Sequence, residues 1–161
     1  MTIQRCGWCS DDPLYMAYHD LEWGRAVFTE AHLFEMLCLE GQQAGLSWIT
    51  VLKKREAYRQ HFFQYSITEI AALSDDDIAL KLQDAGLIRH RGKLQAIRDN
   101  ARAWQKLKDA DINVVTWLWD FVAQQPIRND VPDYRLAPAQ TDASVAMSKA
   151  LKKNGFKFVG P

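Results

Sequence analysis

The sequence predicts an all-α protein that forms a single domain over residues 1–161. The length of 161 residues suits one domain, and 48% of the residues are hydrophobic, which is enough to build a core. Apolar residues recur at helical spacing along the chain, and no segment shows sustained period-two alternation between hairpin turns. We find no internal repeat and no low-complexity tract that would divide the chain.

Residues that favour helix starts define the expected helices of the first part of the chain. Pro13 suits the first turn of a short helix that ends near Gly24. Thr29 and Ser47 carry hydroxyl groups that can accept a backbone hydrogen bond at a helix N-terminus. The expected helices run from 13 to about 24, from 30 to about 43 and from 48 to about 61.

The second part of the chain shows similar signals. Thr68 opens a short helix, and Ser74 with Asp77 resembles a capping box in which Asp replaces Glu. Gly86 ends the helix that follows, and Thr141 caps the last one. A loop at 126–140 holds three prolines. The expected helices cover 68–73, 75–84, 92–108, 113–124 and 142–153.

Basic residues gather in clusters although the formal net charge is zero. Each cluster alone indicates a solvated helix end, because cations favour helix C-termini. Taken together, with acidic residues collected elsewhere at 75–77, they indicate a positive face that binds nucleic acid. The clusters cover 53–55, 89–93 and 149–153.

The cysteine count and hydropathy predict the compartment. Three cysteines, an odd number, do not suggest a disulfide framework. The sequence has no signal peptide and no apolar run long enough for a membrane span. We therefore expect a cytoplasmic protein with reduced thiols, no membrane partner and a monomeric state.

Residues 40–55 form the most informative stretch. A carboxylate, two amides, a flexible glycine, an apolar Leu46 and Trp48 precede a basic run. A core helix would not place Glu40, Gln42 and Gln43 directly after the apolar residues 33–39. A pocket that grips a flat heteroaromatic ring beside a polyanion has a use for each of these side chains.

This stretch and several others resemble the 3-methyladenine DNA glycosylase I family of the helix-hairpin-helix superfamily. The resemblance is loose only over residues 110–140. It implies an enzyme that flips 3-methyladenine out of alkylated double-stranded DNA, hydrolyses its N-glycosidic bond and releases the free base. Its motifs lie at 6–8, 15–20, 22–24, 40–55, 84–93, 148–153 and 155–160.

The resemblance places six side chains in the base pocket. A 3-methylated adenine is cationic, so each aromatic face attracts it by about 0.5–2 kcal/mol. Glu40, when ionised, accepts a hydrogen bond from the exocyclic amine and complements the positive ring. Alternatively, Glu40 is a surface residue, Tyr15 and Tyr18 are core residues, and Trp23 only packs. The pocket residues are Trp8, Tyr15, Tyr18, Trp23, Glu40 and Trp48.

DNA contacts are expected from two segments. The resemblance places Gln42, Gln43 and Leu46 at the gap in the duplex, with Leu46 as the wedge. Residues 75–108 form the expected helix-hairpin-helix, whose turn departs from the usual Gly-hydrophobic-Gly form. Backbone N–H groups at a Gly-rich turn bind phosphate, although an ordinary αα-corner with basic surface residues would look similar. The expected phosphate contacts are Arg89, Arg91, Gly92 and Lys93.

A cationic base leaves readily, so little general-acid catalysis is required. The resemblance implies a family that lacks the catalytic Asp of related glycosylases, although Asp120 could be mistaken for one. We therefore assign the catalytic role to Glu40. Two alternatives predict different behaviour. A non-catalytic binder of damaged DNA releases no base, and an enzyme of free purines or nucleosides does not depend on duplex DNA.

The resemblance also implies a structural zinc site formed by Cys and His from both ends of the chain. Cys6 and His19 match two of its four ligands, and the other two, a His and a Cys, are expected in a C-terminal segment absent from these 161 residues. Cys6 and Cys9 form a C-x₂-C pair without a second pair, which is a weak zinc signal. Alternatively, Cys6 and His19 hold no metal in this chain.

Overall fold

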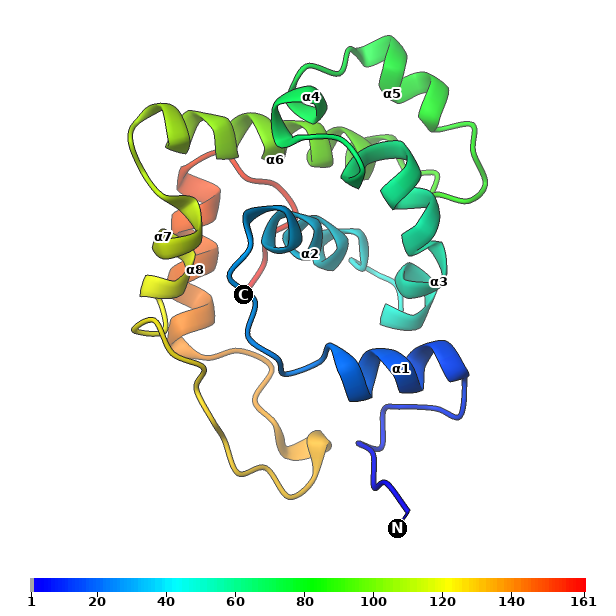
Figure 1. Cartoon of the computed structure of the whole chain (residues 1–161), viewed down its shortest axis with the longest axis vertical. Coiled ribbons are helices and arrows are strands. Elements are labelled where there is room, and N and C mark those ends of the chain that lie inside the picture. Colours follow the sequence, from blue (N-terminus) through cyan, green and yellow to red (C-terminus); the bar gives the residue numbers. More distant parts are fainter. Residues whose placement is uncertain (1) are drawn as a thin grey trace.

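The computed structural model describes residues 2–161 and confirms the all-α prediction (Figure 1). Across this range the structure has eight α-helices and no β-strand, and they form one domain. A π-helical turn, η1 (Arg59–Phe63), extends one helix, and a 3₁₀ turn, η2 (Tyr134–Leu136), lies in the proline-rich loop. The helices are α1 (Pro13–Leu21), α2 (Glu30–Gln42), α3 (Trp48–Tyr58), α4 (Ile67–Ala71), α5 (Asp75–Lys81), α6 (Arg91–Asp109), α7 (Val114–Asp120) and α8 (Asp142–Lys153).

Helix α2 lies in the middle of the fold, with α6 across one side of it and α1 across the other (Figure 1). Helices α3 and α5 lie toward one end of α6, α4 packs along its middle, and α7 and α8 lie toward the other end. Buried aromatic side chains fill the space between α2, α3 and α6. Trp104 packs edge-on against Phe34, and its indole N–H donates to Glu30 at 2.7 Å. The core therefore anchors α2, whose C-terminal end carries Glu40.

Most expected helix starts lie within one or two residues of the observed ones. Pro13 is the first residue of α1, and Asp12 caps that helix by accepting from the Leu14 N–H at 2.9 Å. The capping box of Ser74 and Asp77 is confirmed. The prediction that Thr68 opens α4 was wrong, because Ser66 caps this helix in a capping box with Glu69.

Helix α5 ends at Lys81, earlier than expected, because the chain turns at Asp84. The Asp84 carboxylate accepts from the Gly86 N–H at 2.7 Å and contacts the His61 ring at 2.6 Å. A Cβ on Gly86 would lie only 3.0 Å from the Ala57 Cβ. Gly86 thus lets the turn between α5 and α6 pack directly on α3.

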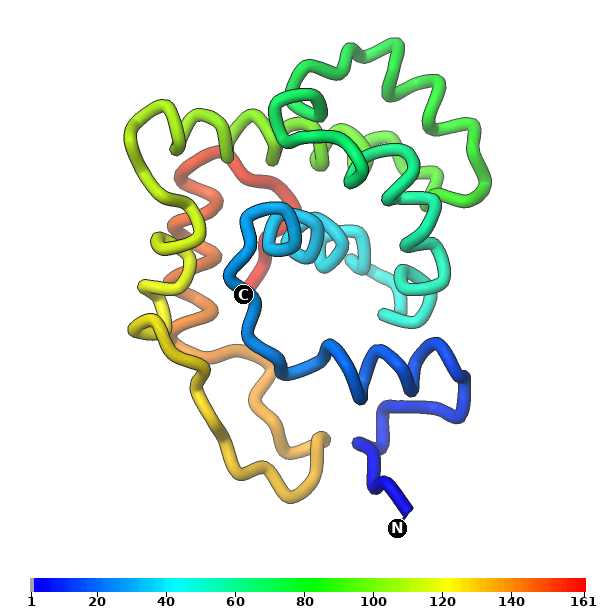
Figure 2. The backbone as a smooth tube through the Cα atoms, viewed as in Figure 1, coloured from blue at the N-terminus to red at the C-terminus, as the bar shows by residue number. Residues whose placement is uncertain are grey.

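The segment after α8 passes α6 and ends beside α2 (Figure 2). The Asn100 side chain holds it on both sides, because it donates to the Lys157 carbonyl at 3.2 Å and accepts from the Lys157 N–H at 2.8 Å. A Cβ on Gly41 would lie 2.8 Å from the Phe158 carbonyl oxygen. This glycine therefore permits the close approach that places residues 158–161 next to Glu40.

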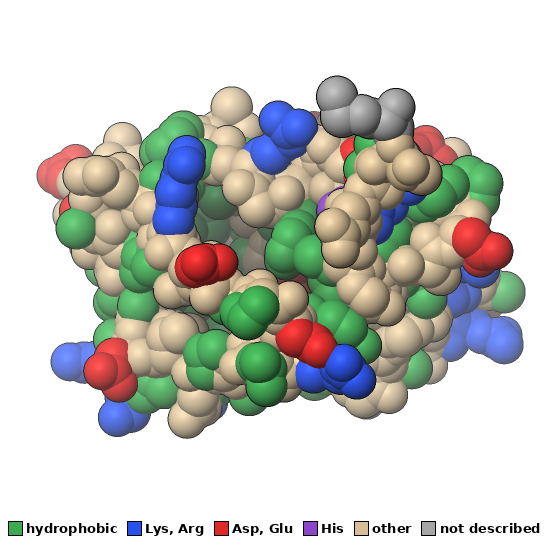
Figure 3. Space-filling view, turned by 90° about the horizontal axis from the view of Figure 1, so that it is seen from below, with side chains coloured by type: hydrophobic (Ala, Val, Ile, Leu, Met, Phe, Trp, Pro, Cys, Tyr) green, Lys and Arg blue, Asp and Glu red, His purple; other side chains and the backbone are tan. Residues whose placement is uncertain are grey.

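The surface seen from below in Figure 3 is hollowed, and apolar side chains gather around the hollow. Lysines and arginines on this face alternate with acidic side chains and form no patch of a single sign. None of the helices within residues 2–161 is both long and apolar enough to span a membrane.

Candidate base-binding site

The six side chains predicted to hold a base line one pocket of about 200 Å³, together with Gln43. Trp8 comes from the N-terminal segment, and Tyr15 and Tyr18 come from α1. Trp23 follows α1 directly, and Trp48 is the first residue of α3. The structure thus brings together residues that are up to 40 positions apart in the sequence.

Trp8 lies at the centre of the aromatic cluster. Its ring centroid is 5.1 Å from that of Tyr15, 6.4 Å from Tyr18 and 5.3 Å from Trp23. Tyr18 in turn lies 5.5 Å from Trp48. Tilted and edge-on contacts at these distances hold each ring in place. The rings therefore form a preformed wall with aromatic faces suited to a flat cationic ligand.

Trp48 and Tyr18 form the buried side of the pocket, with 8% of each residue exposed. Burial raises the pKa of Tyr18 to about 12, and the nearby Glu40 and Glu22 carboxylates add to the shift. Tyr18 is therefore a neutral hydroxyl at physiological pH. The buried indole N–H of Trp48 has no hydrogen-bond partner in the described part of the chain. A ligand that carries an acceptor group would remove the cost of this unsatisfied donor.

Glu40 lies in the last turn of α2 and lines the pocket. Burial raises the pKa of its carboxyl group, and no neighbouring charge or hydrogen bond opposes the shift. The side chain nevertheless remains open to solvent from inside the concave site. Glu40 is thus a carboxylate without a partner, beside aromatic faces, as recognition of a cationic ring requires.

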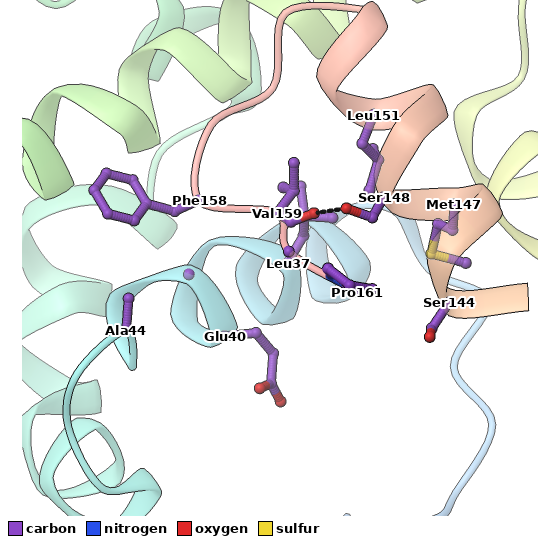
Figure 4. A pocket seen from close by; sticks show the side chains of 12 residues that line it. Leu37, Glu40, Ala44, Ser144, Met147, Ser148, Leu151, Phe158, Val159 and Pro161 are labelled. Carbon is purple, nitrogen blue, oxygen red and sulfur yellow. Dashed lines mark hydrogen bonds between the residues drawn. The ribbon is translucent and has the colours of Figure 1, made fainter. Parts of the chain in front are cut away.

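A larger recess of about 540 Å³ opens on another side of Glu40, between α2, α8 and the C-terminal segment (Figure 4). Aliphatic side chains such as Leu37, Leu151 and Val159 line it, and Phe158 supplies its only aromatic ring. In Figure 4 the Glu40 carboxylate points away from α2 and from the C-terminal segment, and the Phe158 ring points away from the other labelled side chains. The smaller aromatic pocket is therefore the better site for a base, despite the greater volume of this recess.

Arg55 forms a buried ion-pair network beside the pocket, which the sequence did not predict. Its guanidinium donates to Glu22 at 2.8 Å and 2.9 Å and to Glu35 at 3.3 Å. Arg59 donates to the same Glu35 oxygen at 2.8 Å. Because Glu22 follows α1 and Glu35 lies in α2, the network ties together the helices that carry Tyr18 and Glu40.

The prediction that the basic run 53–55 forms part of a DNA-binding surface was wrong for Arg55, whose side chain is buried. Only 7% of Arg55 is exposed, because acidic side chains surround it. Lys54 donates to the Ala85 carbonyl at 2.8 Å, and Lys53 forms an exposed ion pair with Asp12 at 3.5 Å. The run joins α3 to its neighbours.

Gln42 and Lys93 also differ from the prediction, because both side chains are buried. Gln42 is 1% exposed and Lys93 is 5% exposed, so neither side chain can reach DNA. The Gln42 amide donates to the Lys93 carbonyl and accepts from the Tyr58 hydroxyl. Burial lowers the pKa of Lys93. Both side chains therefore join α2 to α6 inside the protein.

Gln43 and Leu46 occupy the loop between α2 and α3. Gln43 reaches the base pocket, and its carbonyl accepts from the Leu46 N–H at 2.7 Å. Leu46 is 41% exposed and stands at the tip of the loop, next to Gly45 with φ of +75°. An exposed leucine beside a base pocket has the placement expected of a wedge, which stays a prediction here.

Comparison with known proteins identifies the family. Residues 8–161 match the model of the methyladenine glycosylase family. The chain belongs to this family. It is 54% identical to DNA-3-methyladenine glycosylase 1 of Escherichia coli K12, over 98% of this chain and 84% of that protein. It is 52% identical to DNA-3-methyladenine glycosylase of Haemophilus influenzae Rd, over 97% of this chain and 84% of that protein.

Solved structures of methyladenine glycosylases share the fold. A crystal structure of 3-methyladenine DNA glycosylase I superposes with a TM-score of 0.95 at 54% identity, over 98% of this chain and 86% of that one. A structure of the Staphylococcus aureus enzyme, which addresses 3-methyladenine recognition, superposes with a TM-score of 0.93. The two chains are 35% identical, over 98% of this chain and 84% of that one.

In this family member the start of α6 is the candidate phosphate contact. Arg89 and Arg91 are exposed, and α6 begins at Arg91. His90 caps the helix, because its ring nitrogen accepts from the Lys93 N–H at 3.0 Å. The N–H groups of Arg91 and Gly92 have no acceptor within the helix and are available to an anion.

The residues predicted to bind zinc lie together but are too few to hold the metal. The Cys6 N–H donates to the His19 Nε2 at 3.3 Å, and the His19 Nδ1 contacts Asp20 at 2.9 Å. A carboxylate on the second ring nitrogen is the usual support of a zinc-bound histidine. Residues 2–161 nevertheless contain no group of three or more donors that could hold a metal ion. The donors described thus do not complete a tetrahedral zinc site.

Proposed function

We propose that this protein is a DNA-3-methyladenine glycosylase that binds the flipped base between the aromatic side chains and Glu40. The observation that carries the proposal is an unpaired carboxylate inside a ring of five aromatic residues. Family membership and the names of relatives at 52–54% identity support the reaction and the substrate.

One feature of the pocket selects the alkylated base, and a second favours its departure. The aromatic faces and Glu40 stabilise a ring that already carries positive charge, and so favour alkylated adenine over normal bases. The same carboxylate stands beside the sugar, where positive charge develops as the N-glycosidic bond breaks. Water then adds to the sugar carbon and loses a proton, and the base leaves with the bonding electrons as a neutral purine. Glu40 is therefore the catalytic residue of this proposal.

The partner that this arrangement suits is double-stranded DNA. The open N–H groups of Arg91 and Gly92 bind a phosphate at the start of α6, and Arg89 and Arg91 add charge. Helices α5 and α6 with their connecting turn act as the helix-hairpin-helix element. Leu46 enters the stack beside the flipped nucleotide. We further propose that the protein acts as a monomer in the cytoplasm.

Mass spectrometry of bases released from methylated duplex DNA tests the proposal. We expect release of free 3-methyladenine, without release of unmodified adenine. Tight binding of methylated DNA without any release would instead favour a non-catalytic binder. Equal release from a free methylated nucleoside and from duplex DNA would favour an enzyme of free purines.

Leu46→Ala should slow base release from duplex DNA. A leucine side chain that becomes buried on insertion contributes about 1.5–3 kcal/mol, so its loss corresponds to roughly 10-fold to 100-fold. The measurement is single-turnover release from duplex and single-stranded substrates, since only the duplex needs a wedge. Leu136→Ala is the matched control, because Leu136 is 71% exposed in η2, outside the proposed DNA-binding elements. An equal loss on both substrates would rule out the wedge role.

A zinc site at Cys6 and His19 would require two further donors beyond those described. We therefore expect the 161-residue chain to purify without stoichiometric zinc and to release 3-methyladenine all the same. Metal analysis of the purified chain, combined with the base-release assay, checks both statements. One zinc per chain, with its loss on Cys6→Ala, would show that other residues complete the site.

A further inference from the structure

Lys93 connects the start of α6 to the end of α2. Its ammonium donates to the backbone carbonyl of Gln42 at 2.9 Å and to that of Ala44 at 2.6 Å. These carbonyls belong to the end of α2 and to the loop that carries Gln43 and Leu46. Helix C-termini leave carbonyl groups without intrahelical partners, and a buried cation satisfies them well. Lys93 therefore caps α2 from a position 51 residues along the chain.

Further hydrogen bonds strengthen this link. The Gln42 side chain donates to the Lys93 carbonyl at 2.9 Å, so the two residues bind each other reciprocally. The Tyr58 hydroxyl donates to Gln42 at 2.8 Å and accepts from the Ile88 N–H at 3.3 Å, within the turn before α6. Tyr58 is fully buried. The connection is thus a buried network in which every hydrogen bond except that between Tyr58 and Gln42 joins a side chain to the backbone.

We propose that Lys93 is a positioning residue that holds the loop with Gln43 and Leu46 in fixed register with the phosphate-binding start of α6. The proposal rests on the proposed function, because it concerns how DNA contact is coupled to opening of the duplex. Gly92, the residue before Lys93, offers its N–H group to phosphate. The Lys93 side chain meanwhile binds the end of α2 and the loop that carries Gln43 and Leu46. Binding of the DNA backbone then places Leu46 and Glu40 at a set distance from the lesion.

This role differs in a measurable way from direct phosphate contact. A lysine that neutralises a phosphate adds about 0.9 to the slope of log affinity against log salt. Lys93 is buried and bound to carbonyls, so its removal should leave that slope unchanged. Its removal should instead disturb insertion of the loop, which is a property of the bound complex.

The test compares Lys93→Met with Arg91→Met, since the two cations lie two residues apart and only Arg91 is exposed. Three quantities are measured. They are the salt slope of duplex binding, the single-turnover rate of 3-methyladenine release at saturating DNA, and the fluorescence of 2-aminopurine placed beside the lesion. Quenching of tryptophan fluorescence by free 3-methyladenine verifies that each variant keeps the pocket. Lys106→Met, an exposed change near the other end of α6, controls for the substitution itself.

For Lys93→Met we expect the wild-type salt slope, a loss of the 2-aminopurine signal and release slower by on the order of 10-fold to 100-fold. For Arg91→Met we expect weaker duplex binding with a salt slope lower by about 0.9. A wild-type rate and signal in Lys93→Met, or a reduced salt slope, would overturn the proposal.

Two provisions separate this proposal from others. If Lys93→Met does not bind free base, Tyr58→Phe becomes the test of the positioning role. This change removes two hydrogen bonds of the network and leaves Lys93 intact. We expect Tyr58→Phe to weaken the 2-aminopurine signal at an unchanged salt slope, and full retention of the signal would overturn the positioning role. The 2-aminopurine fluorescence does not require bond cleavage, so it tests the role of Lys93 independently of base release. Failure of the wild-type protein to release 3-methyladenine would refute the proposed function and leave the Lys93 proposal open to this test.

Discussion

Glu40→Gln should slow release of 3-methyladenine by roughly 10-fold to 100-fold. A hydrogen bond to a charged group is worth about 1.5–3 kcal/mol, and the amide keeps the shape while losing the charge. Discrimination against normal adenine should fall as well, because only the alkylated ring carries the positive charge that Glu40 complements. Single-turnover release from methylated duplex DNA, with Glu56→Gln as an exposed control on α3, measures both effects.

The same substitution should not destabilise the fold. Burial raises the pKa of Glu40 above its ordinary value, so the protein binds the proton more tightly when folded than when unfolded. Stability from this group is therefore present at low pH and is lost as the pH rises through the raised pKa. At neutral pH the ionised side chain opposes folding, and Glu40→Gln removes that cost. Thermal unfolding at pH 7 should show an equal or higher Tm, and a clear decrease would contradict this account.

The rate of base release should change with pH in the direction opposite to that of the stability contributed by Glu40. Recognition of the cationic base needs the ionised carboxylate, so base release should fall as the pH drops through the raised pKa of Glu40. This decline should begin at a higher pH than it would for an ordinary glutamate. In Glu40→Gln the residual rate of base release should not show this decline as the pH falls.

Arg55→Met should lower the free energy of unfolding by about 3 kcal/mol, since removing one partner of a buried ion pair leaves charges uncompensated. We use the lower end of the usual range because a third of the Glu22 side chain is exposed and Arg59 still pairs with Glu35. For a chain of this size the change corresponds to a decrease in Tm of roughly 6–12 °C. Urea unfolding and calorimetry measure it.

Lys53→Met provides the matched control on the same helix. Its ion pair with Asp12 is exposed and spans 3.5 Å, so its loss should cost less than about 1 kcal/mol. Arg55→Met should also weaken quenching by free 3-methyladenine, because the network ties α1, which carries Tyr15 and Tyr18, to α2, which carries Glu40. Equal stability of the two variants would show that the network contributes little.

The sequence predicted the members of the pocket better than the roles of the basic residues. Trp8 and Trp23 each stand next to a glycine, and Trp48 follows Ser47, so these tryptophans have sequence contexts that a family resemblance could use. The helix pattern was similarly readable, because apolar spacing and caps are local. Thr68 was mistaken for the cap of α4 since Ser66 stands only two residues earlier and offers the same hydroxyl chemistry.

The internal polar links could not be predicted in the same way. Gln42, Arg55 and Lys93 belong to residue types that are usually exposed, and each is buried here by partners distant in the sequence. Only the packing of α2 against α3 and α6 determines which carbonyl or carboxylate each one meets. Arg55 resembled part of a basic surface because two lysines precede it.

A crystal structure of the protein with 3-methyladenine tests the central claim most directly. We expect the ring to lie among Trp8, Tyr15, Tyr18 and Trp48, with its exocyclic amine within hydrogen-bonding distance of the Glu40 carboxylate. Binding of the ring in the larger recess between α2 and α8, or an amine that faces away from Glu40, would contradict the assignment of the base pocket.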